Sequence, residues 1–379
     1  MPSKAETTPG PRPTLTPAMT SQTQTRIAAK GPQTEWHDDV AALAPEWEEL
    51  AERTGAAPFL WPGWITAWLR AWGGRPRIVA LREDGELKAV LPLVRRFGLL
   101  ANAANSHTPL AAAVAEDPSY IHQIARAAVA ARAPRTDLRS LDARDPLLAE
   151  MRAAALAHGH TTIERVTDRE PYVDLSGSFE GYEAGLPRKH RKELGRMRRR
   201  LEDEGSVAFE FADGRERLPE LLEEGFRIEG SGWKTERGTA IALVPEVRRF
   251  YTEIAEWAAS RGWLRLAFLR LDGRPLAFHF TLEDGVVAYQ LKGGYDPAFR
   301  ELAPGTLLIQ DMLEWAFATG LHSYEFLGAD EDFKLDWTSG LRDRLAIQAF
   351  PHSPAGAAGW CAFAYGRPAA KRARDLVRR

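Results

Sequence analysis

Residues 263–291 read WLRLAFLRLDGRPLAFHFTLEDGVVAYQL, which is three apolar runs separated by two Asp-Gly pairs. The runs lie at 263–271, 275–282 and 286–291, and the pairs are Asp272-Gly273 and Asp284-Gly285. An Asp-Gly pair between two such runs is a strong signal for a tight β-hairpin turn. The stretch therefore predicts a three-stranded antiparallel meander.

The sequence after the meander predicts one helix and one further strand. Following a loop at 292–304, an apolar helix is expected at 306–319, where Gly320 ends it, and a strand at 323–327. The order strand, strand, strand, helix, strand predicts an α/β (α+β) fold. Its sheet should be mixed, mostly antiparallel and flanked by helices.

The first half of the chain has a similar but weaker pattern. Apolar runs flank Asp84-Gly85, which predicts a hairpin like the one around Asp272-Gly273 and suggests a duplicated unit. Helical spacing of apolar residues, or alanine-rich composition, predicts helices in four segments: 45–53, 64–72, 120–133 and 145–158.

The length of 379 residues suits two domains. Residues 1–35 are rich in Pro, Thr, Ser and Gln, which predicts a disordered tail. The predicted domains are 36–170 and 171–350, followed by a C-terminal extension at 351–379. Their boundary is placed near 169–175, before a Ser/Gly-rich loop.

Composition excludes several classes of protein. Fifty Lys plus Arg against 52 Asp plus Glu leave a net charge of -2, so no global field favours DNA or an anionic membrane. The one cysteine, Cys361, excludes an internal disulfide and a cysteine-based zinc cluster. No signal peptide and no apolar run of about 20 residues are found, so a cytoplasmic protein without a transmembrane segment is expected. Sequence motifs of hydrolases, metalloproteases and dehydrogenases are missing, and no metal site is predicted.

Residues 188–200 carry eight Lys and Arg residues and one acidic residue, Glu193. Leu194, Met197 and Leu201 lie at helical spacing, which predicts a helix that docks through these residues while its basic groups project elsewhere. The basic surface is either a solvated face or a site for a phosphate-bearing ligand or polyanion. A membrane surface is a third interpretation.

The string Gly230 to Thr235, GSGWKT, resembles a phosphate-binding loop but lacks its spacing, because Trp233 separates the last glycine from Lys234. A helix end is expected at Glu229 instead. Trp233 is interpreted mainly as a buried anchor for the loop, and Lys234 as a candidate ligand contact.

Two further segments are candidate site regions. Pro304, Gly305 and Thr306 open the apolar helix, where unpaired backbone N–H groups and the positive end of the dipole favour an anion. After the strand at 323–327, the acidic loop GADEDFKLDW contains a single lysine, Lys334, beside Phe333. Lys334 lies between two aromatic positions and beside three carboxylates, a setting that can position or tune an amine. The alternative is a solvated turn above packed Phe333 and Trp337.

Several of these strings together resemble the CelD-like acetyltransferases of the GNAT superfamily, a bacterial group associated with cellulose and exopolysaccharide biosynthesis and related to Fem-type aminoacyltransferases. The strings are RKHRKEL at 188–194, GWK at 232–234, KGGYD at 292–296, Pro304-Gly305, FLGAD at 326–330 and Phe333-Lys334. The resemblance covers about 36–350 and is specific in the second half.

The resemblance implies tandem GNAT-like domains, acetyl-CoA or another acyl-CoA as donor, and an amine or sugar-linked hydroxyl of a small molecule or glycan as acceptor. It places the donor at Leu291, Lys292 and the helix start at 304–306, with N–H groups near Leu291 polarising the thioester carbonyl. The family's usual pyrophosphate loop, Arg/Gln-x-x-Gly-x-Gly/Ala, is reduced here to Pro304-Gly305.

Transfer from a thioester also needs a base for the proton of the acceptor. The candidate catalytic residues are Lys334 and three carboxylates, Asp330, Glu331 and Asp296. The candidate acceptor contacts are Trp233, Lys234, Tyr295, Phe333 and Trp337.

Two other functions fit the sequence. One is a Fem-like transferase that depends on aminoacyl-tRNA, in which the basic helix would bind RNA phosphates; tRNA is a partner only in this case. The other is a non-catalytic GNAT-like module that binds a polysaccharide or a synthase, which would fit the reduced donor loop.

Overall fold

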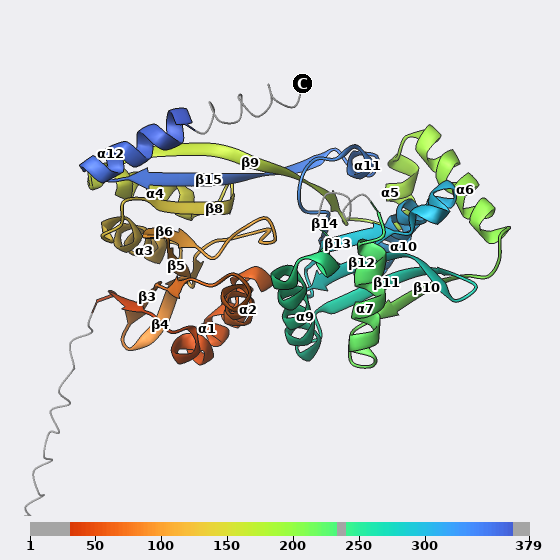
Figure 1. Ribbon diagram of the computed structural model, residues 1–379, viewed down its shortest axis with the longest axis horizontal. Coiled ribbons are helices and arrows are strands. Elements are labelled where there is room, and N and C mark those ends of the chain that lie inside the picture. Colours follow the sequence, from red (N-terminus) through yellow and green to blue (C-terminus); the bar gives the residue numbers. More distant parts are fainter. Residues whose placement is uncertain (1–30, 233–239, 367–379) are drawn as a thin grey trace, which may run out of the picture.

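A computed structural model describes residues 31–232 and 240–366. The molecule has two lobes joined by a pair of long strands, β9 and β15, which run across the top of Figure 1. None of the helices in these described ranges is both long and apolar enough to cross a membrane.

The N-terminal lobe contains the first four helices and the first nine strands, the last of which, β9, continues into the C-terminal lobe. The helices are α1 Val40–Thr54, α2 Pro62–Trp72, α3 Ser119–Ala130 and α4 Pro146–Ala157, with a 3-10 turn η1 at Pro58–Leu60. The strands are β1 Gln33–His37, β2 Arg75–Pro76, β3 Ile78–Glu83, β4 Glu86–Leu91, β5 Leu93–Arg96, β6 Leu99–Asn102, β7 Val114–Ala115, β8 Thr136–Asp142 and β9 Thr161–Asp174.

In the C-terminal lobe the meander, the apolar helix and the following strand occur in the predicted order, and four helices and the strand β10 precede the meander. The helices of this lobe are α5 Phe179–Gly185, α6 Arg188–Glu202, α7 Leu218–Glu229, α9 Pro245–Ser260, α10 Pro304–Ala318 and α11 Asp332–Leu335. The last helix, α12 Pro354–Cys361, lies on the N-terminal lobe, at the far end of β15 (Figure 1). The strands of the C-terminal lobe are β10 Val207–Ala212, β11 Leu264–Leu271, β12 Arg274–Glu283, β13 Val287–Tyr295, β14 Ser323–Glu325 and β15 Gly340–Phe350. The short helical turns are η2 Ile241–Leu243, η3 Pro297–Leu302 and η4 Ala362–Gly366.

One eleven-stranded sheet runs through both lobes, in the order β10-β11-β12-β13-β14-β9-β15-β8-β6-β5-β2. Only two of its pairs are parallel, β13 with β14 and β6 with β8. A separate four-stranded sheet, β1-β3-β4-β7, completes the N-terminal lobe. The predicted fold class, a mixed and mostly antiparallel sheet flanked by helices, is confirmed.

Two of the three predicted Asp-Gly turns have the backbone that such pairs favour. Asp272 and Gly273 both have positive φ, 49° and 80°, and so do Asp84 and Gly85, 52° and 87°. Two successive residues with positive φ are the signature of a type I′ hairpin, whose twist matches that of the flanking strands. The meander and the N-terminal hairpin are therefore both present as predicted.

Two predicted boundaries differ from the structure. The stretch at 169–175, taken as the start of the second domain, lies almost entirely within β9, which pairs with β14 of the C-terminal lobe. Residues 33–35, assigned to the tail, begin β1 and pair with β3. Backbone hydrogen bonds hold such an edge strand without apolar side chains, so composition did not reveal it.

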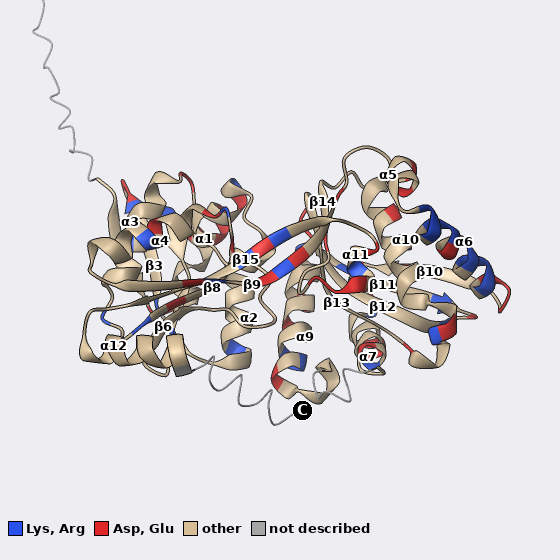
Figure 2. Ribbon diagram, turned by 90° about the horizontal axis from the view of Figure 1, so that it is seen from above, with Lys and Arg blue, Asp and Glu red and all other residues tan. Residues whose placement is uncertain are grey.

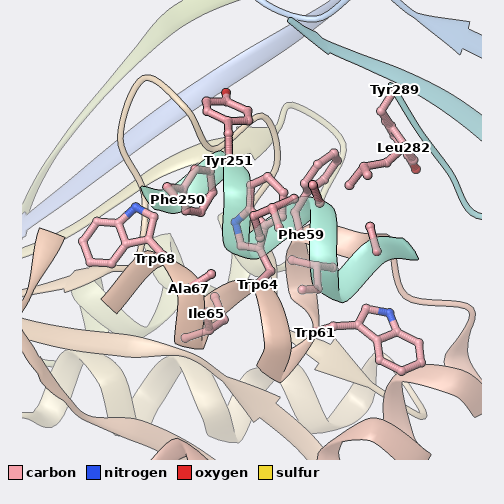
Figure 3. Close-up of a cluster of buried hydrophobic side chains, with 14 of the residues drawn as sticks. Phe59, Trp61, Trp64, Ile65, Ala67, Trp68, Phe250, Tyr251, Leu282 and Tyr289 are labelled. Atoms are coloured by element: carbon pink, nitrogen blue, oxygen red, sulfur yellow. The ribbon is translucent and has the colours of Figure 1, made fainter. Parts of the chain in front are cut away.

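Aromatic side chains fill the contact between the lobes (Figure 3). Trp64 of α2 meets Phe250 of α9 edge to face at 5.0 Å, and Phe59 meets Tyr289 of β13 at 4.9 Å. A Cβ atom on Gly63 would lie 2.1 Å from Nε1 of Trp257, so only glycine permits this approach of α2 to α9. The two lobes thus share one apolar core.

Candidate functional site

The central feature of the C-terminal lobe is a split between β13 and β14. The two strands pair in parallel only over three positions, the last being Tyr289 opposite Glu325. Beyond this point β13 continues to Tyr295, whereas the chain after β14 stays on β9, with the Phe326 N–H donating to the carbonyl of Pro171 at 3.0 Å. Within the described residues, no strand pairs with this side of β13 past Tyr289.

A β-bulge lies at the start of the split. Phe280 of β12 faces Lys292, but the next residue, Thr281, faces Gln290, so Leu291 is the extra residue on β13. A bulge bends its strand and redirects the backbone groups beside it. The predicted donor contacts Leu291 and Lys292 therefore lie where β13 turns away from β14.

Close packing of α7 fixes the second half of β13. A Cβ atom on Gly294 would lie 2.7 Å from the Cα of Glu229, the last residue of α7. The helix end predicted at Glu229 is confirmed. Trp233 and Lys234, the candidate acceptor contacts that follow it, lie outside the described residues.

The start of α10 lies at the open end of the split. Its N-cap, Ala303, has a left-handed backbone with φ 50°, and no side chain caps the helix. The ring of Tyr295, at the end of β13, lies over Gly305, where a Cβ atom would be 3.1 Å from Cδ1 of the ring. The structure therefore places Tyr295 beside the helix start at 304–306, while Leu291 and Lys292 lie earlier on the same strand, β13. A role of these residues in donor binding stays a prediction.

A buried polar chain spans the apex of the split on the side of α10. The hydroxyl of Tyr324 on β14 donates to Oε1 of Gln290 at 3.0 Å, and Nε2 of Gln290 lies 3.2 Å from Nε2 of His279. Burial raises the pKa of Tyr324 far above its usual range, so this hydroxyl remains a donor. His279 is buried and hydrogen-bonded, as expected for a core histidine.

The other side of the split carries Lys334, which is only 7% exposed. Its ammonium donates to the carbonyls of Leu327 at 2.7 Å and Ala329 at 3.0 Å and pairs with Glu331 at 2.9 Å. Three acceptors match the three N–H donors of an ammonium. Leu327 and Gly328 both have left-handed backbones, with φ 56° and 66°, so Lys334 holds together a tight turn at the end of β14.

The other predicted residues of this loop divide into exposed and buried ones. Asp330 and Glu331 are exposed, and Phe333 is 48% exposed. Trp337 is buried, and its carbonyl accepts a hydrogen bond from the hydroxyl of Tyr182 at 2.7 Å. Trp337 thus packs in the core, where the alternative interpretation of this loop placed it, whereas Phe333 does not.

Asp296 has a local structural role. Its carboxylate accepts a hydrogen bond from the N–H of Ala298 at 3.0 Å, capping η3, and pairs with Arg274 at 2.7 Å. Of the three candidate bases, Asp296 and Glu331 are therefore paired with cations, and Asp330 is not paired with any described residue. The candidate residues that the structure describes thus form two groups. One group lies along β13 and at the start of α10, and the other lies in the loop after β14.

A cleft between the lobes was not predicted from the sequence. It has a volume of about 370 Å³ and is lined by Leu110, Asp142, Arg144, Asp145, Val287, Tyr289, Ser323, Glu325, Arg342 and Arg344. These residues come from β8, β13, β14, β15, the loop between β8 and α4 and the loop between β6 and β7, which the shared sheet brings together. A local signal does exist, since Arg342 and Arg344 alternate along a strand and therefore share a face.

Residues 188–335 match a family described as an acetyltransferase (GNAT) domain. This segment is GNAT-like. It contains both diverging strands, the start of α10 and the turn held by Lys334. No relative was found among the curated proteins.

Solved structures similar to the whole chain include FemX, at 14% identity and a TM-score of 0.54, with 83% of this chain and 96% of FemX covered. Another is the C-terminal domain of a protein described as a putative lysylphosphatidylglycerol synthetase of Agrobacterium fabrum. Its sequence identity is 16% and its TM-score 0.52, and the match covers 82% of this chain and 92% of that domain. A third is a Bacteroides thetaiotaomicron protein of unknown function, with a sequence identity of 9% and a TM-score of 0.53. The match covers 84% of this chain and 100% of that protein. At these identities the likeness shows a shared fold.

Proposed function

We propose that the protein is an acyltransferase that takes an acyl group from acyl-CoA, with acetyl-CoA as the first donor to test. The observation that carries this proposal is the split between β13 and β14, which ends at the uncapped start of α10. The split leaves backbone groups of β13 without a strand partner among the described residues, and the helix start favours an anion such as a pyrophosphate. The GNAT match of residues 188–335 supports the same reaction class.

The proposed reaction joins the acceptor to the acyl group and releases a thiol. The lone pair of an amine or hydroxyl attacks the thioester carbonyl, and N–H groups of β13 near Leu291 stabilise the oxyanion of the tetrahedral intermediate. The intermediate collapses by breaking the carbon–sulfur bond, and the leaving thiolate takes up a proton from solvent to give the thiol. Asp330 takes the proton of the acceptor, because its carboxylate is not already paired with a described residue.

Lys334 has a positioning role in this proposal. Its ammonium is occupied by Leu327, Ala329 and Glu331, so it acts on the reaction through the shape of the turn that carries Asp330. The acceptor class, an amine or sugar-linked hydroxyl in polysaccharide or cell-envelope synthesis, rests on the resemblance to CelD-like enzymes. A cytoplasmic location is proposed because the single cysteine, Cys361, fits a reducing compartment.

Thr306→Glu tests the donor site without damaging the helix. A carboxylate in the first turn of α10 interacts favourably with the helix dipole, by about 0.3–1 kcal/mol, but repels a pyrophosphate. We expect acetyl-CoA affinity, measured by calorimetry, to fall at least about tenfold while the melting temperature holds or rises. Thr306→Gln is the neutral control and should bind as wild type does.

Two outcomes would contradict the proposal. Equal acetyl-CoA affinity in the Glu and Gln variants would place the donor away from α10. No binding by the wild type at about 1 mM would favour the non-catalytic module or the aminoacyl-tRNA-dependent enzyme.

The aminoacyl-tRNA-dependent function is favoured by the basic face of α6, whose exposed residues include Lys189, Lys192, Arg199 and Arg200 (Figure 2). RNA binding through several phosphates would weaken steeply with rising salt, whereas a small-molecule site would change far less. Filter binding of bulk tRNA over a range of salt concentrations separates the two functions.

A further inference from the structure

The cleft between the lobes lies on the opposite face of the sheet from α10. Ala288 and Tyr324 point into the core under α10, whereas Tyr289, the next residue on β13, belongs to the core on the other face. Tyr289 and Glu325 line the cleft and are also the last paired residues before the split. With a rise of about 3.3 Å per residue, a ligand in the cleft lies within one or two residues of the split.

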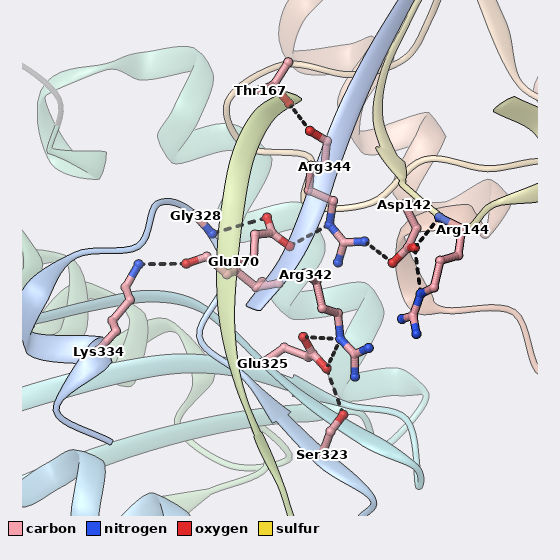
Figure 4. Close-up of polar contacts among 11 residues, drawn as sticks. Asp142, Arg144, Thr167, Glu170, Ser323, Glu325, Gly328, Lys334, Arg342 and Arg344 are labelled. Atoms are coloured by element: carbon pink, nitrogen blue, oxygen red, sulfur yellow. Dashed lines mark hydrogen bonds and ion pairs between the residues drawn. The ribbon is translucent and has the colours of Figure 1, made fainter. Parts of the chain in front are cut away.

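The carboxylates of the cleft are already bound to cations or hydrogen-bond donors (Figure 4). Glu325, which is buried, accepts from Nε of Arg342 at 3.0 Å and from the hydroxyl of Ser323 at 2.9 Å. Asp142 accepts from Nη1 of Arg344 at 3.0 Å and from the backbone N–H of Arg144 at 2.9 Å. Their negative charge is therefore largely neutralised from within the protein.

Asp145, the remaining carboxylate, is less charged than an exposed aspartate. It caps α4 by accepting from the N–H of Leu147 at 2.8 Å. Burial, together with the nearby charge of Asp142, raises the pKa of Asp145 to about 6. It therefore opposes an incoming anion less and less as the pH falls through about 6.

The arginines, in contrast, retain unused donors. A guanidinium has five N–H donors, and Arg342 uses Nε for Glu325 while its terminal nitrogens bind no described residue. The ring of Tyr172 lies 3.9 Å from its central carbon and holds the guanidinium in place. Arg144, with a side chain 77% exposed, contacts Asp142 through Nε at 3.5 Å and likewise keeps its terminal nitrogens unpaired among the described residues.

An excess of N–H donors over acceptors, in a cleft that opens next to the split, suits a ligand with acceptor oxygens. We propose that Arg342 and Arg144 bind a carboxylate or phosphate group of the acyl acceptor, so that the acceptor is an anionic molecule that enters from the face opposite the donor. The assignment of this ligand as the acceptor rests on the proposed function. Planar guanidinium groups recognise carboxylates and phosphates through paired hydrogen bonds, which would also orient the acceptor.

The test uses three amino sugars that differ only at carbon 6: glucosamine, glucosamine 6-phosphate and 2-amino-2-deoxyglucuronic acid. Binding to the full-length protein is measured by calorimetry without an acyl donor. We expect both anionic sugars to bind at least about tenfold more tightly than glucosamine. The sugar acid and the sugar phosphate are measured separately. The one that binds with the higher affinity shows whether the site prefers a carboxylate or a phosphate.

Variants then assign the binding to the cleft. Arg144→Gln changes an exposed residue, so it should fold normally and lower the affinity for the anionic sugars about tenfold without affecting glucosamine. Arg342→Lys keeps a cation beside buried Glu325 but removes the planar fork, and should have the same effect. Arg152→Gln is the matched control, because Arg152 is on α4 but pairs with Glu164 outside the cleft, and it should change nothing.

Equal binding of the three sugars, or wild-type affinities in both cleft variants, would overturn the proposal. Because no acyl donor is present, this result is independent of the proposed function. If the anionic sugars bind through Arg144 but thiol release from acetyl-CoA does not follow, the proposed function is wrong while the anion site stands.

Discussion

A single ammonium group holds the turn at the mouth of the split. Leu327 is a branched residue with φ 56°, a left-handed conformation that costs about 1–2 kcal/mol and is usually left to glycine. Lys334 offsets this cost by binding the carbonyls of Leu327 and Ala329, while the Gly328 N–H donates to Glu170 at 3.3 Å. Side chains on both sides of the turn thus fix the segment that carries Asp330.

Lys334→Met separates this positioning role from direct catalysis. The substitution keeps an aliphatic stem but leaves two carbonyls and Glu331 without the ammonium. We expect the free energy of unfolding to fall by about 2–3 kcal/mol, because buried acceptors that lose their donor cost about 1–3 kcal/mol each. Urea denaturation measures this change. The rate of acyl transfer should fall together with the free energy of unfolding.

Phe333→Ala is the control for the Lys334 variant. Phe333 neighbours Lys334 but is 48% exposed, so its removal should change stability by less than about 1 kcal/mol. A Lys334→Met protein with wild-type stability and lost activity would instead assign the ammonium to the chemistry, as the sequence alone suggested.

The importance of Lys334 could be predicted from the sequence, but its partners could not. One lysine among Asp330, Glu331 and Asp332 predicts an ion pair, and a pair with Glu331 is present. The carbonyls of Leu327 and Ala329 are invisible to such reasoning, because every residue has a carbonyl and only the left-handed turn directs these two at the ammonium. Composition therefore singled out a lysine that holds this turn but not the carbonyls that it binds, and its part in the reaction stays a prediction.

At the scale of elements, α6 has two kinds of basic residue. Arg198 faces inward, pairs with Asp311 of α10 and is only 25% exposed. Arg199 and Lys192 are exposed, and no described residue forms an ion pair with them. The predicted docking residues Leu194 and Leu201 are buried, so the helix attaches as expected and leaves most of its charge outside.

Charge reversal should therefore have different effects on the two faces. Arg198→Glu places a carboxylate against Asp311 and should lower the free energy of unfolding by about 3 kcal/mol or more, as expected when a largely buried ion pair loses its cation. Lys192→Glu with Arg199→Glu should change it by less than about 1 kcal/mol, because exposed charges contribute little.

The same pair of variants tests what α6 binds. If the helix binds a polyanion, the Lys192→Glu and Arg199→Glu protein should show weaker and less salt-dependent tRNA binding than wild type. Activity and binding that match wild type at every salt concentration would make the exposed basic face a solvated surface only.

Elements whose signal is local were predictable, whereas those defined by distant partners were not. The meander, α10 and the alanine-rich helices follow from apolar spacing and turn residues. The fourteen residues of β9 include TDRE at 167–170, which has no strand-like pattern, and they form a strand because β14 and β15 pair with them. The cleft was missed for the same reason.

At the scale of the whole molecule, the last strands of the two halves are exchanged. β9 leaves the N-terminal lobe and lies between β14 and β15, and β15 returns to pair with β8 of the N-terminal lobe. The C-terminal lobe thus needs β9 from the first half of the chain, and the N-terminal lobe needs β15 from the second half. The aromatic contact of α2 with α9 joins them a second time.

This exchange predicts that the C-terminal lobe cannot fold without β9. A fragment of residues 177–379 would contain β14 with one open edge and β15 with two, since its partners β8 and β9 lie in the other fragment. Unpaired strand edges and the exposed aromatic face of α9 favour aggregation over folding. We expect this fragment to lack dispersed amide signals in NMR spectra, and residues 1–176 mixed with it during refolding to restore them.

The full-length chain supplies the control for the fragments. A protease site inserted beside the exposed Gly177 allows the folded protein to be cut after assembly, and the two pieces should then remain associated during gel filtration. Independent folding of 177–379 would show that β14 and β15 reach their positions without β9. In that case the part of the cleft that Arg342 and Glu325 line would form within the C-terminal lobe, and Leu110, Asp142, Arg144 and Asp145 would depend on the union of the lobes.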